Sequence, residues 1–191
     1  GEKHIREQIE SVIAQTYSNW VLFVQDDSST DNTLNIVKQF SLNYPNILQI
    51  DSERRQKSAK NFMSLLTKVS SFEYYMFCDQ DDVWDPKKIQ ISINKIKEAE
   101  QQFPQKPILV HTDVRVVDEK LCLLYPSYWK TRKIEQKDVS DFYHLSVRSR
   151  IIGCTSIFNH KTREKVLPFS PHLLMHDWWV SLIVAYYGKV H

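Results

Sequence analysis

Glycine and cysteine are both scarce in this sequence, with three residues of each in 191. The sequence contains no GxGxxG or GxxxxGK[ST] motif, so the common glycine-rich loops that bind phosphate through backbone amides are excluded. Cys78, Cys122 and Cys154 form no CxxC pair, which indicates neither a zinc site nor a disulfide framework and favours a reducing compartment. Any phosphate that the protein binds must therefore be held by other groups.

Long apolar runs and a strong excess of one charge are also absent. No apolar run approaches the ~18 residues that span a bilayer, and we expect no signal peptide before the first helix. The formal net charge is +2, which argues against a dedicated nucleic-acid surface. A length of 191 residues with 42% hydrophobic and 25% charged residues, without repeats or linkers, predicts one ordinary globular domain.

Two apolar stretches, 20–24 and 74–78, each stop at a group of aspartates that is followed by a helical pattern. A repeated order of strand, acidic loop and helix is typical of an α/β layer fold with a largely parallel sheet. Further strands are expected at 47–50, 108–117 and 151–158, and a hairpin partner at 121–124. Helices are expected at 5–13, 34–40, 62–69, 86–96, 138–146, 161–166 and from 176 onward.

The second acidic group places Asp79, Asp81 and Asp82 within four positions at the end of an apolar strand. Such crowded anions are costly unless a cation or hydrogen-bond donors offset them. A divalent metal that also holds an anionic substrate is the simplest offset, since Mg²⁺ prefers one or two carboxylates plus phosphate oxygens. The alternative is an acidic surface turn that caps a helix beginning at Asp85 and Pro86.

The first acidic group, Asp26 and Asp27, also lies just beyond a predicted strand. In open α/β sheets, ligands bind beyond the carboxyl ends of the strands. If the two strands are near neighbours, both acidic groups line one crevice. A diphosphate would then be held by metal rather than by a glycine loop.

Four short motifs, in this order along the chain, resemble those of inverting nucleotide-sugar glycosyltransferases of the GT-A fold, family 2. They are QTYSNW at 15–20, QDDSSTDNT at 25–33, DQDDVW at 79–84 and HDWW at 176–179. The last motif is similar to that of a subset often described as rhamnosyltransferases. The resemblance implies α/β/α layers around a largely parallel mixed sheet, and it covers the whole chain.

The resemblance also implies roles for single residues. Asp27 would accept a hydrogen bond from the imide N–H of uracil or thymine, with Asp26 supporting its loop. Asp79 would face the ribose or the metal, Mn²⁺ or Mg²⁺, and Asp81 would coordinate that metal. Asp82 would support this site or face the acceptor.

Asp177 matches the family's catalytic base, which takes the proton of the acceptor hydroxyl as its oxygen attacks the anomeric carbon. The alternative role for Asp177 is a helix N-cap, and His176 is expected to be a packed or surface histidine. Adjacent helical residues point about 100° apart, so at most one of Trp178 and Trp179 faces the site; Trp178 is placed on the acceptor side.

Basic and aromatic side chains supply further candidates with weaker signals. Arg54, Arg55, Lys57 and Lys60 could contact the diphosphate, Lys60 first among them, or form a solvated loop. Tyr125, Tyr128 and Trp129 could form an acceptor-side lid or pack a loop. The sequence therefore does not decide between the two roles given for each of these segments.

The resemblance predicts a metal-dependent enzyme that transfers a sugar, with dTDP-rhamnose as the leading donor, from UDP or dTDP to a glycan or lipid-linked acceptor. Such an enzyme would work in the cytoplasm, with peripheral association at the inner face of the membrane compatible with a lipid-linked acceptor. Residues 1–191 would form one catalytic domain that lacks the family's first strand and a C-terminal extension. The alternatives are a nucleotidyltransferase, or a degenerate domain that binds a partner or glycan without catalysis.

Overall fold

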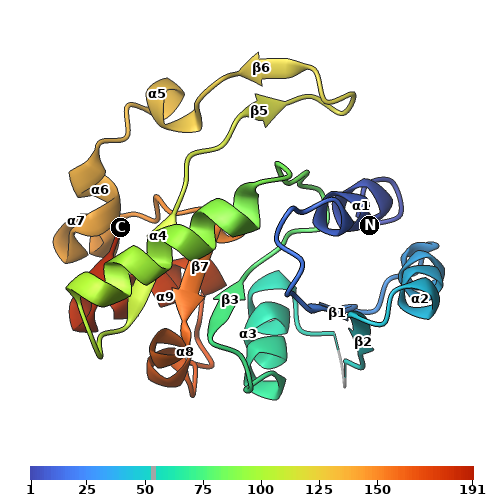
Figure 1. Ribbon diagram of the computed structural model, residues 1–191, viewed down its shortest axis with the longest axis horizontal. Helices are drawn as coiled ribbons and strands as arrows, with labels where there is room; N and C mark the ends of the chain where they lie inside the picture. Colours follow the sequence, from blue (N-terminus) through green and yellow to red (C-terminus); the bar gives the residue numbers. More distant parts are fainter. Residues whose placement is uncertain (53–54) are drawn as a thin grey trace.

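The computed structural model describes residues 1–52 and 55–191, so Arg54, one of the predicted basic candidates, lies outside the described residues. The fold has three layers, with helices on both faces of a central sheet (Figure 1). The nine α-helices that the described residues form are α1 (Ile5–Ile13), α2 (Thr33–Asn43), α3 (Ser58–Lys68), α4 (Lys88–Gln102), α5 (Tyr128–Arg132), α6 (Gln136–Ser140), α7 (Phe142–Val147), α8 (His160–Val166) and α9 (His176–Tyr187).

The central sheet has the strand order β3–β7–β4–β8. β7 runs antiparallel to both β3 and β4, while β4 and β8 are parallel. A separate parallel pair, β1 with β2, lies beyond β3, and β5 with β6 forms an antiparallel hairpin. The strands are β1 (Leu22–Gln25), β2 (Ile47–Ile50), β3 (Tyr74–Met76), β4 (Ile108–His111), β5 (Val116–Val117), β6 (Leu123–Tyr125), β7 (Ser156–Asn159) and β8 (Lys189–Val190). The expected mixed α/β sheet is thus confirmed.

Side chains of β4 alternate between two hydrophobic cores, one on each face of the sheet. Ile108 and Val110 pack with the α4 face, while Leu109 packs on the opposite side with residues of α3, α8 and α9. Successive side chains of a strand point to opposite faces, so a strand that is buried on both sides reads as a continuous apolar run. A third core joins α1 and α2 to the β1–β2 pair.

Several expected boundaries were wrong; the helix predicted for 138–146, for example, is divided at Asp141 into α6 and α7. The strand predicted for 151–158 begins only at Ser156, because Gly153–Thr155 form a 3₁₀ turn, η1. The strand predicted for 108–117 is interrupted after His111 and resumes as β5. The helix predicted to start at Pro86 begins at Lys88, and the side chain of Asp85 instead accepts a hydrogen bond from the Lys87 amide at 3.1 Å.

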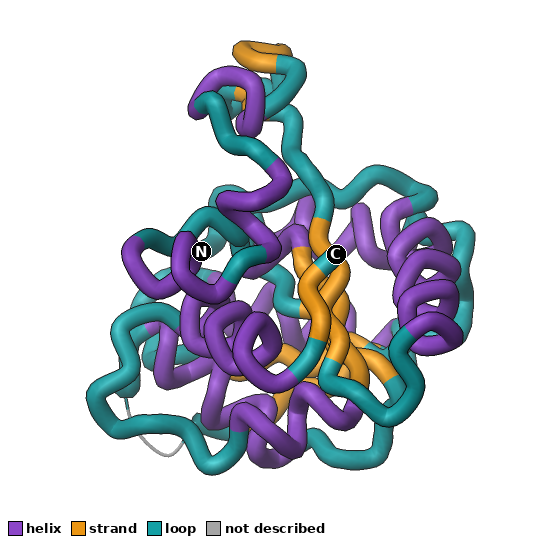
Figure 2. Tube along the Cα trace, turned by 90° about the vertical axis from the view of Figure 1, so that its left-hand side faces the viewer, coloured by secondary structure: helices purple, strands orange, loops and turns teal. Residues whose placement is uncertain are grey.

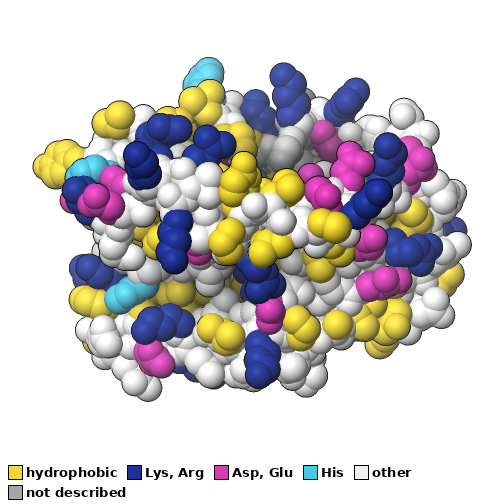
Figure 3. Space-filling model, turned by 90° about the horizontal axis from the view of Figure 1, so that it is seen from above, with side chains coloured by type: hydrophobic (Ala, Val, Ile, Leu, Met, Phe, Trp, Pro, Cys, Tyr) yellow, Lys and Arg dark blue, Asp and Glu magenta, His cyan; other side chains and the backbone are white. Residues whose placement is uncertain are grey.

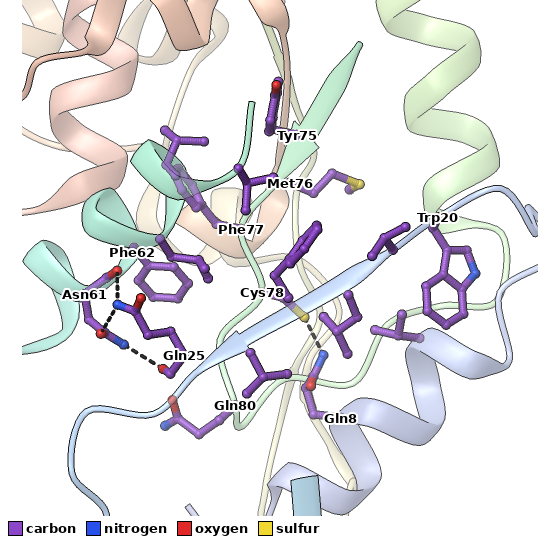
Figure 4. Close-up of a pocket in the computed structure, with 18 of the residues that line it drawn as sticks. Gln8, Trp20, Gln25, Asn61, Phe62, Tyr75, Met76, Phe77, Cys78 and Gln80 are labelled. Atoms are coloured by element: carbon purple, nitrogen blue, oxygen red, sulfur yellow. Dashed lines mark hydrogen bonds between the residues drawn. The ribbon is translucent and has the colours of Figure 1, made fainter. Parts of the chain in front are cut away.

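A cavity of about 1020 Å³ separates β1 from β3. Its walls include Leu22–Gln25 of β1 and the residues from Tyr74 to Phe77 on the β3 side. Figure 4 shows Gln25 on one side and Tyr75, Met76 and Phe77 on the other. β1 pairs with β2 alone and β3 with β7 alone among the strands of the described residues, so each has one open edge. The two parts of the sheet are therefore separated by an apolar slot.

The β5–β6 hairpin and α5 project from the body of the molecule, as the views in Figures 1 and 2 both show. Within the described part of the chain, no helix is both long and apolar enough to cross a membrane.

Candidate active site

An acidic loop follows β3 and begins the site. Asp79 and Asp82 are half-buried there, whereas Asp81 is exposed. Burial raises the pKa of Asp79 to about 6, and the charges of Asp82, Asp81 and Asp177 add to that rise. Burial also raises the pKa of Asp82. The fold therefore holds carboxylates where their charges are unfavourable, which is typical of functional sites.

The η1 turn adds a thiol to this acidic group. Ligand atoms of Asp79, Asp82 and Cys154 all lie within 4.8 Å of one another. Burial raises the pKa of the Cys154 thiol well above its usual range, with the Asp82 charge contributing. Two close carboxylates suit a hard divalent cation, so the donor set fits the predicted metal. Asp81 lies outside this three-residue cluster, and its metal role stays a prediction.

Asp177 reaches the same site from α9. Its Oδ2 accepts a hydrogen bond from the Gly153 amide at 3.1 Å, and its Oδ1 accepts one from the Trp178 amide at 2.7 Å. The helix cap position belongs to Met175 rather than to Asp177, which lies in the first turn. The N-cap alternative is therefore wrong. The carboxylate is held by backbone groups at a place where it also acts on Asp79.

His176 lies underneath Asp177 as a packed residue. It is 2% exposed, stacks on Phe62 with ring centroids 4.2 Å apart, and meets the Phe77 ring edge-on at 4.6 Å. Burial lowers the pKa of His176. Neither ring nitrogen has a hydrogen-bond partner within the described residues. The expectation of a packed histidine is confirmed.

The two tryptophans beside Asp177 anchor α9 in different directions. The Trp178 indole N–H donates to the Leu145 carbonyl of α7 at 2.6 Å, and the Trp179 indole N–H donates to the Val166 carbonyl of α8 at 3.0 Å. Both side chains are half-buried. Because the Trp178 N–H already has a partner, a contact with the acceptor would be made by the ring face. That contact stays a prediction.

The loop after β1 is tied to the start of α3. Both oxygens of Asp27 accept backbone hydrogen bonds, from Gln56 at 2.6 Å and from Lys57 at 2.8 Å. Asp26 accepts from the Ser29 amide at 2.7 Å and so closes its own turn. Lys60 is exposed in the first turn of α3.

Gln25 and Asn61 fix this corner by exchanging hydrogen bonds, Gln25 Nε2 to Asn61 Oδ1 at 2.7 Å and Asn61 Nδ2 to the Gln25 carbonyl at 2.8 Å (Figure 4). Asp26 and Asp27 line the same cavity as Cys78 and Gln80, the neighbours of Asp79. The structure thus brings Asp79, Asp81, Asp82 and Asp177 together and sets the two loop ends along one cavity.

Sequence reasoning missed three residues of this site. Lys88 places its ammonium 4.9 Å from the Trp84 ring centroid. Burial lowers the pKa of Lys88, while the charge of Asp82 opposes that shift. Gly153 and Cys154 reach the site through the η1 turn, which lies within the apolar run at 151–158 that predicted a strand. Lys88 could have been noted as the cation directly after the acidic loop, but no local signal marks the other two.

The comparisons with known proteins agree with this geometry. The sequence model described as Glycosyl transferase family 2 matches residues 1–158. The chain is 29% identical to the dTDP-rhamnosyl transferase RfbG of Shigella flexneri, over 94% of this chain and 61% of that protein. It therefore spans less than two thirds of this relative's length.

Two solved structures share the fold at low identity. A mannosyltransferase from Pyrobaculum calidifontis, in complex with GDP-Man and Mn²⁺, has a TM-score of 0.69 and 14% identity, over 97% of this chain and 49% of that one. TarS of S. aureus in complex with UDP has a TM-score of 0.63 and 20% identity, over 100% of this chain and 54% of that one.

Proposed function

Because the chain belongs to glycosyl transferase family 2 and has the GT-A fold, we propose that it transfers a sugar from a nucleoside diphosphate to a glycan or lipid-linked acceptor, with inversion at the anomeric carbon. The observation that carries this proposal is the meeting of the acidic loop after β3 with Asp177 of α9. A metal-dependent transferase needs both an anion-binding metal and a base. These two groups of carboxylates supply the residues for both.

Asp177 is the base in this proposal. Its carboxylate takes the proton of the acceptor hydroxyl while that oxygen forms a bond to the anomeric carbon and the bond from this carbon to the diphosphate oxygen breaks. The Gly153 and Trp178 amides hold the carboxylate in place during this transfer. A single displacement inverts the anomeric centre, so no covalent nucleophile is required.

Asp79 and Asp81 are proposed to hold the divalent metal, with Asp82 beside them, and the close carboxylates of Asp79 and Asp82 support this. When bound, Mn²⁺ or Mg²⁺ supplies positive charge that stabilises the departing nucleoside diphosphate. A bound cation would in turn stabilise the ionised carboxylates, because its charge opposes the burial and the repulsion that raise the pKa of Asp79.

The nucleotide is proposed to lie against the loop after β1. Asp27 would accept from the imide N–H of uracil or thymine with the oxygen lone pairs that its two backbone donors leave free, while Asp26 keeps the turn closed. Lys60 is exposed near that loop and is proposed to meet the diphosphate. The name of the Shigella flexneri relative makes dTDP-rhamnose the first donor to test.

The acceptor side is proposed to include Asp82, Trp178 and the projecting β5–β6 hairpin. Apolar side chains of this hairpin are exposed, and basic residues surround them; Figure 3 shows yellow and dark blue side chains side by side on this face. Exposed apolar residues combined with positive charge favour the surface of an anionic membrane. We therefore propose peripheral membrane association through the hairpin on the cytoplasmic side, where a lipid-linked acceptor would be presented. The apolar residues are Val117, Leu121, Leu123, Leu124 and Tyr125, and the basic ones are Arg115, Lys120, Lys130, Arg132 and Lys133.

The slot between β1 and β3 is proposed to receive an extended segment that joins both parts of the sheet within one catalytic domain. Two open strand edges and an apolar lining support this, because an unpaired edge readily takes a further strand. Slow amide exchange along both edges in a longer form of the protein is the expected result. Fast exchange along both edges there would contradict it.

The test of the function begins with binding. A thermal-shift series of UDP, dTDP, GDP and ADP, each with and without Mn²⁺, should show stabilisation by UDP or dTDP that depends on the metal. Sugar transfer is then measured with the matching nucleotide-sugars as donors. Release of pyrophosphate from a nucleoside triphosphate, or no nucleotide binding at all, would contradict the proposal.

A further inference from the structure

The η1 turn touches both halves of the acidic site. Gly153 donates its amide to Oδ2 of Asp177 at 3.1 Å, and the next residue, Cys154, places its sulfur within 4.8 Å of a carboxylate oxygen of Asp82. The turn is itself fixed, because the amide and hydroxyl of Thr155 both donate to the Ile152 carbonyl, at 3.0 and 2.7 Å. Two consecutive residues therefore connect α9 to the loop after β3.

Space at Gly153 is limited on the side of α9. A Cβ at this position would lie 2.8 Å from Nε2 of His176 and 3.4 Å from Cβ of Asp177. Since His176 is packed between Phe62 and Phe77, its ring cannot give way without disturbing the core. A side chain larger than hydrogen at Gly153 would therefore push on Asp177 or on the histidine beneath it.

Cys154 is set apart from the other cysteines by its burial. It is 6% exposed, and its sulfur lies within 4.8 Å of carboxylate oxygens of both Asp79 and Asp82. A hydrogen-bond donor at this place offsets part of the repulsion between the two carboxylates and fixes the direction of Asp82. By contrast, Cys122 is exposed on the hairpin turn and far from these groups in the fold.

We propose that Gly153 and Cys154 are positioning residues, which set the separation between the Asp177 base and the metal-binding loop by holding one carboxylate each. The inference rests on the proposed function, since it assigns no chemistry of its own to the turn. Neither residue touches the reacting atoms. Both act through the carboxylate that they hold, as outer partners of metal ligands and bases commonly do.

Comparing Cys154→Ser with Cys154→Ala distinguishes the effect of a hydrogen-bond donor from the effect of packing alone. Cys154→Ser keeps a donor of nearly the same size, whereas Cys154→Ala removes it. Loss of an outer partner of this kind costs about 10–100-fold in metal affinity or activity. We therefore expect Cys154→Ala to lose about 10–100-fold in Mn²⁺ affinity or in kcat, and Cys154→Ser to retain most of both. Cys122→Ala is the matched control for Mn²⁺ affinity, which it should leave unchanged, because Cys122 lies on the exposed hairpin turn and not at the acidic loop.

Gly153→Ala tests the other arm of the turn. It should lower kcat while Mn²⁺-dependent nucleotide binding is kept, because it disturbs Asp177 rather than Asp79. Melting temperatures of all variants identify any that fail to fold. Equal losses in the serine and alanine variants would show packing or direct metal ligation by sulfur, and so would overturn the inference.

The two proposals fail in different ways. If the unchanged protein binds no Mn²⁺ and transfers no sugar, the proposed function is wrong and the positioning role falls with it. If the unchanged protein does both, and Cys154→Ala and Gly153→Ala match it in Mn²⁺ affinity and kcat, only the positioning role is wrong.

Discussion

Asp79 and Asp177 lie far apart in the sequence, yet their charges interact in the fold. Burial, then Asp82 and Asp81, and then Asp177 raise the pKa of Asp79 to about 6. This relationship means that the site stores unfavourable charge in the absence of a cation. Many enzymes retain destabilising groups of this kind where function needs them, at a cost in stability.

Asp79→Asn should stabilise the metal-free protein at pH 7.5. A carboxyl whose pKa is raised by folding contributes stability below its ordinary value of 3.8, and that contribution is lost as the pH rises through about 6. Neutralising it should raise the free energy of unfolding by about 1–2 kcal/mol, a discounted value from 1.36 kcal/mol per pKa unit. Urea unfolding at pH 7.5 and pH 4 measures this. The gain should vanish at pH 4, and Glu119→Gln on the exposed hairpin turn is the control.

Mn²⁺ should raise the melting temperature more at pH 7.5 than at pH 5. Protons compete with the metal for Asp79, whose pKa is about 6, so this carboxyl is largely protonated at the lower pH.

Asp81→Ala should abolish the metal-dependent part of UDP or dTDP binding while the fold remains intact. Undiminished Mn²⁺-dependent binding in Asp81→Ala would show that the cluster of Asp79, Asp82 and Cys154 holds the metal without it.

Asp177→Asn should keep donor binding and lose turnover. The amide side chain preserves an oxygen that can accept from Gly153 or Trp178, but it cannot take a proton from the acceptor. General-base catalysis contributes about 10²–10⁴-fold, and we expect kcat to fall within that range. Comparable turnover in the variant would exclude Asp177 as the base, whereas loss of nucleotide binding would show a structural role.

Asp27→Ala should loosen the start of α3 as well as weaken nucleotide binding. The change leaves the Gln56 and Lys57 amides without their charged acceptor, and bonds to charged groups contribute about 1.5–3 kcal/mol when buried. Because Lys57 is exposed, we expect the lower end of that range. Urea unfolding and faster amide exchange at Gln56 and Lys57 measure this. Asp51→Asn, on the connection from β2 to α3 that also carries Gln56 and Lys57, is the control. An equal effect in both variants would contradict the assignment.

The strand ends and the acidic loops could be predicted because their signals are local. The apolar runs stop at Asp26 and at Asp79, and a strand that is buried on both faces needs no partner to be recognised. Asp177 could not be placed from spacing alone, since only a family resemblance connected it to the loop after β3.

The remaining features depend on contacts between distant segments. The η1 turn interrupts a stretch that reads as a strand, because Gly153 must present its amide to Asp177. Along α2, Ile36 is buried while Leu34 is exposed, since Ile36 packs in the core that α2 shares with α1 and β2. The position of Lys88 near Asp82 likewise follows from the folded loop, which the sequence does not display.

Leu123→Glu should weaken binding to vesicles of phosphatidylcholine and phosphatidylglycerol. The hairpin exposes apolar residues between basic ones, and a new negative charge there removes apolar contact and opposes the anionic surface. We expect the lipid concentration that gives half-maximal co-sedimentation to rise about 30-fold, since loss of apolar burial and of charge attraction each costs about 1 kcal/mol. Leu42→Glu is the matched control, because Leu42 is 78% exposed on α2, away from the hairpin. Equal binding by both variants and the unchanged protein would contradict the membrane role, and a concentration-dependent dimer lost in Leu123→Glu would assign the hairpin to a second copy of the chain instead.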